Sequence, residues 1–156
     1  MPAEPIIGSL VEALALDLDA VLGDTRPLWR AWLEDLRRRA RVDIELPEDR
    51  AAAASVLDGV VGNWRVLLER FAEENAPIHL RPSAEVNAAL RRLSADGVRL
   101  GAFTDAPEPL ARVAAAQLGV ARRLDALETG AGAQERLLER FGPDARIVRS
   151  AADLAG

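Results

Sequence analysis

The chain has 156 residues, enough for one domain with a sizeable core; 49% of them are hydrophobic and 29% charged, which indicates a globular protein. The formal net charge of −5 argues against a general nucleic-acid-binding protein. All 20 basic residues other than histidine are arginine, and the chain contains neither lysine nor cysteine. Catalytic lysines, thiolate catalysis and disulfides are therefore excluded. Because His79 is the only histidine, a metal site with several histidines is excluded as well.

The N-terminal segment predicts neither a signal peptide nor a membrane span. It has no basic region at its start, and the apolar stretches at 6–7 and 11–16 are short and interrupted. We therefore expect a cytoplasmic protein that binds neither membrane nor nucleic acid.

The first half of the chain predicts one strand followed by helices. Residues 13–16 form a short apolar run that ends at Asp17, which is typical of a buried strand. A helix follows, with Asp24 and Thr25 as its N-cap residues. After a break at 42–47, a second helical stretch is predicted from about 48 to 75, with a kink at Gly59 or Gly62 and a break at Ala76-Pro77.

The second half alternates regularly between helices and strands. Helices are predicted over 83–95, 107–118 and 131–141, and strands over 98–103, 124–127 and 145–148. Alternation at this spacing predicts an α/β fold with a parallel sheet covered by helices. The stretch 26–81 interrupts the alternation and is interpreted as a small α-helical insertion.

Two predicted strands end in polar residues. Asp17-Leu-Asp19 follows the first strand, and Thr104-Asp105 follows the strand at 98–103. Ligands of open parallel sheets bind beyond the carboxyl ends of the strands. One carboxylate could attack phosphorus while the other gives a proton to the leaving group, and the Thr104 hydroxyl could hold phosphate oxygens.

Structural roles are the alternative for several of these residues. Asp24 and Thr25 could serve only to cap the helix that follows them. Asp105 and Glu108 form an Asp-x-x-Glu pattern typical of a capping box. On the residues alone, the Asp17–Asp19 pair is more often incidental than functional.

The segment Asp17-Leu-Asp19-Ala-Val-Leu-Gly-Asp24-Thr25 resembles the first motif of the haloacid dehalogenase-like hydrolase superfamily, and Leu-Gly-Ala-Phe-Thr104-Asp resembles its second motif. The helical insertion resembles the α-helical cap of the subgroup typified by β-phosphoglucomutase and phosphoglycolate phosphatase. The resemblance implies a Rossmann-like core with helices on both faces, formed by residues 1–25 and 82–156, and a cap formed by 26–81.

The resemblance also implies roles for the individual residues. Asp17 would be the nucleophile that forms an aspartyl-phosphate, and Asp19 would be the general acid and base. Thr104 and Asp105 would bind the phosphoryl group of a small phosphorylated substrate. Asp17, the backbone carbonyl of Asp19, and Asp153 would hold Mg²⁺. The second aspartate of the first motif favours phosphoryl chemistry over dehalogenation.

The third and fourth motifs of the superfamily are not intact in this sequence. The third is normally a lysine, occasionally an arginine, that pairs with the nucleophile and the phosphate, and this chain has no lysine. Arg122, Arg123 and Arg136 lie near the expected segment, but each is expected to face solvent. In the fourth motif, Asp153 fits the second acidic position, whereas Arg149 stands where a magnesium-binding acid is expected. Arg149 either compensates for the lost positive charge or marks a site that has lost its metal and turnover together.

The sequence thus leaves three functions open. The first is a phosphatase of a small phosphorylated metabolite, and the second is a pseudoenzyme that keeps the fold and binds an anion or a protein partner without turnover. The third is a helical interaction module with an incidental Asp pair, which predicts no parallel sheet. A homodimer is also left open. His79 is expected to be a structural or surface residue, and Trp29, Trp32 and Trp64 are expected to pack within the cap.

Overall fold

The computed structural model describes residues 12–41 and 43–154. Its centre is a parallel four-stranded sheet with the strand order β3-β2-β1-β4. The strands are β1 (Ala13–Asp17), β2 (Arg99–Thr104), β3 (Ala126–Thr129) and β4 (Arg146–Val148). Register places Asp17 at the end of β1 beside Phe103 of β2, so the carboxyl ends of the two central strands lie at one edge. The first segment considered for a leader, residues 1–11, lies outside the described residues.

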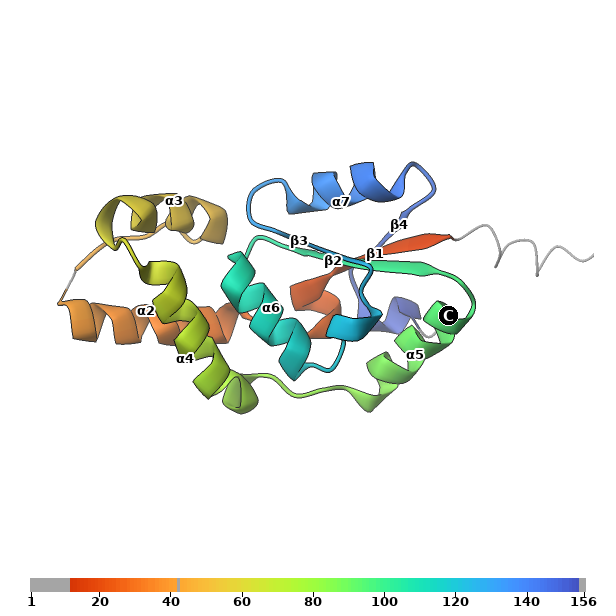
Figure 1. Ribbon diagram of the computed structural model, residues 1–156, viewed down its shortest axis with the longest axis horizontal. Coiled ribbons are helices and arrows are strands. Elements are labelled where there is room, and N and C mark those ends of the chain that lie inside the picture. Colours follow the sequence, from red (N-terminus) through yellow and green to blue (C-terminus); the bar gives the residue numbers. More distant parts are fainter. Residues whose placement is uncertain (1–11, 42, 155–156) are drawn as a thin grey trace, which may run out of the picture.

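Helices cover both faces of this sheet, as Figure 1 shows. One face carries α7 (Ala133–Phe141), and the other carries α5 (Ala84–Ala95) and α6 (Glu108–Gln117). The α7 face is built closely against β2, because a Cβ atom at Gly101 would lie 2.7 Å from side-chain atoms of Leu137 and Phe141. The larger apolar cluster lies on the opposite face and continues into the helical insertion. The predicted α/β fold with helices on both faces is confirmed.

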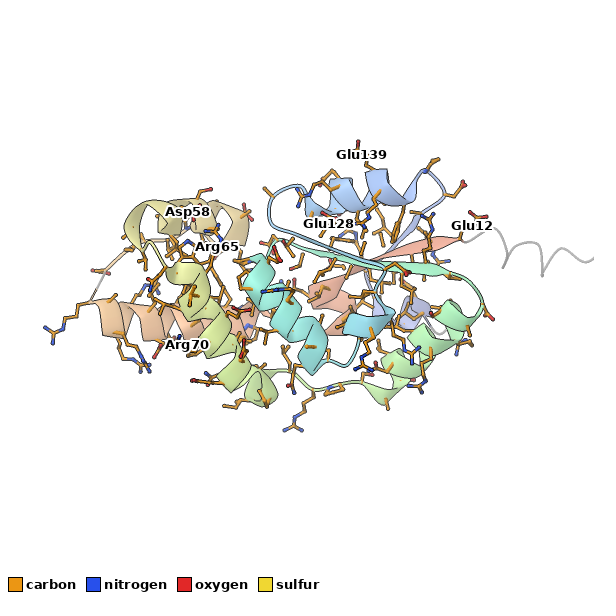
Figure 2. All side chains as sticks on the ribbon, viewed as in Figure 1. Glu12, Asp58, Arg65, Arg70, Glu128 and Glu139 are labelled. Atoms are coloured by element: carbon orange, nitrogen blue, oxygen red, sulfur yellow. The ribbon has the colours of Figure 1, made fainter. Side chains whose placement is uncertain are left out.

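The insertion forms a separate group of three helices beside the sheet (Figure 1). They are α2 (Arg26–Ala40), α3 (Arg50–Val60) and α4 (Trp64–His79). The three tryptophans pack here as predicted, with ring centroids 5.3 Å apart for Trp29 and Trp32 and 6.0 Å apart for Trp32 and Trp64. Asp58 of α3 pairs with Arg65 of α4 at 2.6 Å (Figure 2). We call residues 26–81 the cap.

The structure corrects the predicted helices of the cap. The prediction of one kinked helix over 48–75 is wrong. The stretch forms two helices, because α3 ends at Val60 and α4 begins at Trp64. The break at Pro77 is also wrong, since α4 continues through it to His79. A proline in the last turn removes only one helical hydrogen bond, and the Leu80 amide still donates to the Ala76 carbonyl at 2.8 Å. His79 is exposed at the end of α4, as expected for a surface histidine.

The remaining elements are short turns of helix between the larger ones. A five-residue π-helical turn, Leu18–Leu22, follows β1, and 3₁₀ turns lie at Ala121–Arg123 and Ala151–Leu154. Within the described residues, no helix is both long enough and apolar enough to span a membrane.

Candidate functional site

Asp17 and Asp19 leave the central strand in different directions because the chain turns immediately after Asp17. In the π-helical turn, Leu18, Val21 and Leu22 are buried, so the residue between them, Asp19, points toward the cap side of the sheet edge. The Asp17 carboxylate accepts a hydrogen bond from the Ala20 amide at 3.3 Å. The two side chains therefore lie at the same edge but have different partners.

Asp19 is surrounded by hydroxyl donors. The Thr25 hydroxyl donates to its Oδ1 atom at 2.5 Å, and the Thr25 amide donates to the same atom at 2.9 Å. The Thr104 hydroxyl donates to Oδ2 at 2.7 Å. Thr25 is the N-cap residue of α2, as predicted, but its side chain makes no capping hydrogen bond; the Asp24 carboxylate accepts from the Arg26 amide at 3.0 Å. Thr25 and Thr104 together orient the Asp19 carboxylate.

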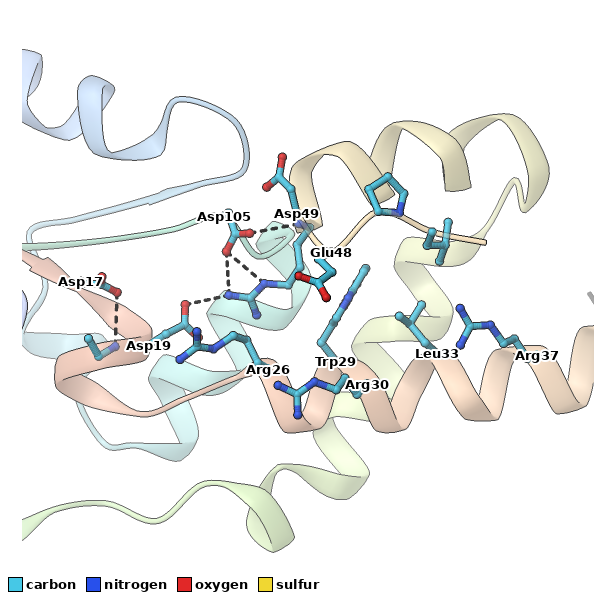
Figure 3. Close-up of a pocket in the computed structure, with 14 residues that line it drawn as sticks. Asp17, Asp19, Arg26, Trp29, Arg30, Leu33, Arg37, Glu48, Asp49 and Asp105 are labelled. Carbon is cyan, nitrogen blue, oxygen red and sulfur yellow. Dashed lines mark hydrogen bonds and ion pairs between the residues drawn. The ribbon is translucent and has the colours of Figure 1, made fainter. Parts of the chain in front are cut away.

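Arg50, the first residue of α3, connects the cap to this edge of the core. Its Nη2 atom lies 2.8 Å from Asp19 Oδ2 and 2.8 Å from Asp105 Oδ1. Its Nη1 atom donates to the Thr25 hydroxyl at 2.6 Å, and its Nε atom donates to Asp105 Oδ1 at 3.1 Å. The dashed lines that leave Asp19 and Asp105 in Figure 3 end on this arginine. Only 3% of the Arg50 side chain is exposed, so these are buried, charge-assisted hydrogen bonds.

Asp105 belongs to this network and not to a capping box. The N-cap of α6 is Pro107, and the Asp105 carboxylate accepts from the backbone amide of Arg50 at 3.1 Å in addition to the guanidinium. The predicted capping box with Glu108 is therefore wrong. The sequence pattern suggested local pairing, but a cation from the cap, 55 residues away in the chain, outcompetes the helix end for this carboxylate.

The charge of Arg50 sets the ionisation of both carboxyls. Burial alone would raise the pKa of Asp19, but Arg50 and the hydrogen bonds from Thr25 and Thr104 outweigh it and lower that pKa. For Asp105, burial again raises the pKa, but the hydrogen bond and charge of Arg50 outweigh burial and lower the pKa. Both groups therefore remain carboxylates near neutral pH. A carboxylate held in this way is a poor proton donor, which bears directly on the general-acid role implied for Asp19.

Arg149 approaches the other carboxylate. Its Nη1 atom lies 3.6 Å from Asp17 Oδ2, and its Nη2 atom donates to Gln134 Oε1 at 2.8 Å. None of the other arginines considered for the missing lysine, Arg122, Arg123 and Arg136, makes an ion pair with Asp17 or Asp19 among the described residues. Arg136 instead pairs with Glu128 at 3.1 Å. Each aspartate of the first motif thus has its own arginine partner.

The described residues do not fit a bound Mg²⁺. Mg²⁺ takes oxygen ligands in near-octahedral geometry, which requires carboxylate oxygens that are free to face it. Arg149 lies 3.6 Å from the Asp17 carboxylate, at the position where an acidic ligand is expected, and Asp153 lies on the 3₁₀ turn Ala151–Leu154, where its own backbone carbonyl accepts from Arg146. No group of three His, Cys, Asp or Glu residues within 12–41 and 43–154 is arranged to hold a metal ion. The magnesium set Asp17, Asp19 and Asp153 is not brought together.

A cavity of about 720 Å³ lies between the core and the cap at this edge. Asp17, Asp19 and Asp105 line its inner end, and α2 together with residues 46–50 forms its walls. Figure 3 shows the side chains that line it. No buried side-chain nitrogen or oxygen of the described residues lacks a hydrogen-bond partner, so the inner end of the cavity is satisfied by the protein itself.

Solved structures define the fold class to which this arrangement belongs. The chain is similar to CbbY from Rhodobacter sphaeroides in complex with phosphate, with a TM-score of 0.67 and 14% identity over 93% of this chain and 83% of that one. It is also similar to a putative β-phosphoglucomutase from Thermotoga maritima, with a TM-score of 0.55 and 20% identity over 92% and 82%. The chain therefore has the haloacid dehalogenase-like fold with a helical cap, as the sequence motifs predicted.

Comparisons of sequence alone add no closer relationship. No protein-family model matches the chain. No curated protein matches it either. At these identities, the structural similarity establishes the fold, and the chemistry has to be argued from the residues of this chain.

Arg50 is the site residue that sequence reasoning missed. It lies in Asp49-Arg50-Ala51, where Asp49 accepts from the Ala51 amide and caps α3. Nothing in this segment distinguishes Arg50 from the other 19 arginines of the chain. The one available signal was indirect: two acidic motif residues and no lysine require a cation from elsewhere, and a cap folded over the sheet edge is a place from which it can come.

Proposed function

We propose that the chain binds a small anionic ligand in the cavity between cap and core and does not hydrolyse it. The observation that carries this proposal is the pairing of both motif aspartates with arginines, Asp19 with Arg50 and Asp17 with Arg149. The phosphate named with the similar Rhodobacter sphaeroides structure supports an anion as the ligand class. The pseudoenzyme hypothesis is thus favoured over turnover.

The pairing with Arg50 removes what phosphoryl transfer would need from Asp19, and Arg149 competes with a substrate for Asp17. A nucleophilic carboxylate has to approach phosphorus, and a general acid has to carry a proton at the working pH. Asp19 is held as a carboxylate by Arg50, and its Oδ2 atom also accepts from Thr104. The described residues do not fit Mg²⁺. A phosphate ester would therefore meet only guanidinium groups, and the protein's own carboxylates already pair with these.

A second function remains in view because of one observation on Asp17. This residue ends the central strand, lines the cavity and is 24% exposed, which leaves its carboxylate accessible from the cavity. An aspartyl-phosphate phosphatase of a small metabolite is therefore the alternative. In that case Arg149 and Arg50 would stabilise the phosphoryl oxygens, and the proton for the leaving group would come from water or substrate.

One probe, 4-nitrophenyl phosphate, separates the two functions. Binding is measured by calorimetry and by quenching of tryptophan fluorescence, because Trp29 lines the cavity. Turnover is measured in the same samples as nitrophenolate release, with and without added Mg²⁺. We expect binding without release above the level of the Asp17→Asn variant. Asp58→Asn, in the cap but not among the residues that line this cavity, is the matched control and should bind as the wild type does.

Two results would contradict the proposed binding function. Release that requires Asp17 and is stimulated by Mg²⁺ would establish the phosphatase instead. Absence of any binding to the wild-type protein would remove the anion-binding proposal even if no phosphate is released.

A further inference from the structure

The outer part of the cavity has a wall of arginines that the motif residues do not explain. Arg26, Arg30 and Arg37 of α2 all line the cavity, and Figure 3 shows them on the side of α2 that borders it. At about 100° per residue, positions 26, 30, 33 and 37 fall within roughly 60° of one another around the helix axis. The three arginines and Leu33 therefore form one stripe along the helix, which we call the α2 stripe.

Contacts within the described residues account for the α2 stripe only in part. Arg30 makes no ion pair or hydrogen bond within residues 12–41 and 43–154. Arg26 pairs only with its neighbour Asp24, at 2.8 Å on the surface, and Arg37 donates to the Ile44 carbonyl at 3.2 Å. By contrast, Arg38 and Arg39, which do not line the cavity, both pair with Asp35.

The N-terminal part of the stripe is unfavourable for the helix that carries it, whereas Arg37 lies in the last turn, where a cation is favourable. Cations in the first turn of a helix oppose its macrodipole, and like charges four residues apart repel each other. Arg26 begins α2 and pairs with Asp24 just before the helix, but Arg30 follows four positions later and the first turn holds no acidic residue to offset it. A cation such as Arg30, which opposes the helix dipole and lines a cavity, is explained if a ligand pairs with it.

We propose that the α2 stripe binds a small linear dicarboxylate, with its carboxylates on the guanidinium groups and its carbon chain along Leu33 and Leu46. The inference rests on the proposed anion-binding function and names its ligand class. A helix rises about 1.5 Å per residue, so Arg26 and Arg30 are separated by about 6 Å along the axis and Arg30 and Arg37 by about 10 Å. A planar carboxylate can accept two parallel hydrogen bonds from one guanidinium group. Two arginines separated by about 6 to 10 Å can therefore bind the two ends of the ligand.

The opposite wall limits the charge that the ligand can carry. Glu48 and Asp49 line the cavity across from α2, and neither makes an ion pair among the described residues. A phosphate brings nearly two negative charges per group at neutral pH, whereas a carboxylate brings one. The acidic wall therefore favours a dicarboxylate over a bisphosphate whose charged groups are equally far apart. Replacing Glu48 should change the affinity for both ligands.

The experiment compares ligands of different length and charge on the intact chain. The probes are straight-chain dicarboxylates of four to ten carbons, butyrate as the single-ended control, and the bisphosphate of propanediol as the competing chemistry; calorimetry gives the dissociation constants. We expect an optimum at about six to ten carbons, with binding about tenfold tighter than that of butyrate. Arg30→Gln should weaken the optimal dicarboxylate about tenfold, Glu48→Gln should tighten it a few-fold, and Arg38→Gln should leave it within about twofold.

Each contrary result has a distinct meaning. Equal affinity for butyrate and the dicarboxylates, equal losses in Arg30→Gln and Arg38→Gln, or tighter binding of the bisphosphate would overturn the dicarboxylate assignment. If the dicarboxylates fail while 4-nitrophenyl phosphate still binds, the proposed function stands without this inference. If 4-nitrophenyl phosphate is hydrolysed while dicarboxylate binding still depends on Arg30, the dicarboxylate inference stands. The proposal that the chain does not hydrolyse its ligand is then wrong.

Discussion

The two ends of the cavity use arginine in opposite ways. At the inner end, Arg50 is buried and every polar group around it has a partner in the protein. At the outer end, Arg30 and Arg37 are exposed on α2 and have few partners or none among the described residues. The same side chain therefore completes the fold at one end of the cavity and remains available to a ligand at the other.

This difference indicates where a ligand has something to gain. A ligand that entered the inner end would have to replace hydrogen bonds that Asp19, Asp105 and Thr25 already make with Arg50. A ligand at the outer end would displace only solvent from Arg30 and would compete with exposed contacts at Arg26 and Arg37. Stability should thus depend on the inner arginine, and binding should depend on the outer ones.

Replacement of Arg50 by methionine should have the largest effect on stability. Asp19 is only 10% exposed on its side chain and would be left as a buried carboxylate without its cation. Removing one partner of a buried pair typically costs about 3 to 5 kcal/mol of unfolding free energy. Urea unfolding of Arg50→Met against the wild type measures this loss.

Arg65→Met is the matched control for that prediction. Arg65 pairs with Asp58 at a similar distance, but both side chains are about half exposed (Figure 2). Exposed pairs contribute about 0 to 1 kcal/mol, so this variant should stay within 1 kcal/mol of the wild type. Equal losses in the two variants would mean that the inner network is no stronger than a surface pair.

The acid dependence of stability should fall next in size. Because Arg50 and the hydroxyl donors lower the pKa of Asp19 below its usual value of 3.8, the folded state binds a proton there less readily than the unfolded state. The contribution is therefore fully present above about pH 4 and is lost as the pH falls through the folded-state pKa. Asp19→Asn should unfold about 1.5 to 3 kcal/mol more easily at pH 7.

Denaturant unfolding across the acid range checks the sign of this effect. The difference between wild type and Asp19→Asn should shrink as the pH falls below about 4, while Asp105, whose pKa is also lowered, leaves a residual acid dependence in both proteins. A difference that grows toward low pH would show that Asp19 is stabilised in its protonated form.

Arg149→Asp tests the smaller pair at Asp17. The Arg149 and Asp17 side chains are 57% and 24% exposed, so the loss of this pair should cost no more than about 1 kcal/mol. The variant also places an acidic residue where the fourth motif of the superfamily that the sequence resembles has a metal ligand. We expect calorimetry to detect Mg²⁺ binding in Arg149→Asp and not in the wild type. Mg²⁺ binding of equal strength in both would contradict our reading of the wild-type donor set.

The fold could be predicted from the sequence because local patterns indicate its strands and helices. The apolar run before Asp17 and the helix–strand alternation after residue 82 predict the parallel sheet, and register then brings Asp17, Asp19 and Thr104 to one edge. The contact of Arg149 with Asp17 follows from the same edge. Arg50 could not be placed in this way, because its position depends on how the cap folds over the core. Similarly, the capping box predicted at Asp105 is absent because Asp105 forms an ion pair with Arg50, which is distant in the sequence.

The smallest predicted change in stability is the one that best separates the two ends of the cavity. Arg30→Gln removes an exposed cation four residues after Arg26, where like charges in a helix cost about 0.2 to 0.5 kcal/mol. The variant should therefore be as stable as the wild type or slightly more stable, within about 0.5 kcal/mol, when thermal unfolding is compared. The same substitution is expected to weaken dicarboxylate binding about tenfold, a change of about 1.4 kcal/mol. A loss of stability in Arg30→Gln would instead mean that the α2 stripe supports the cap, and the contrast between a structural and a ligand-binding arginine would no longer hold.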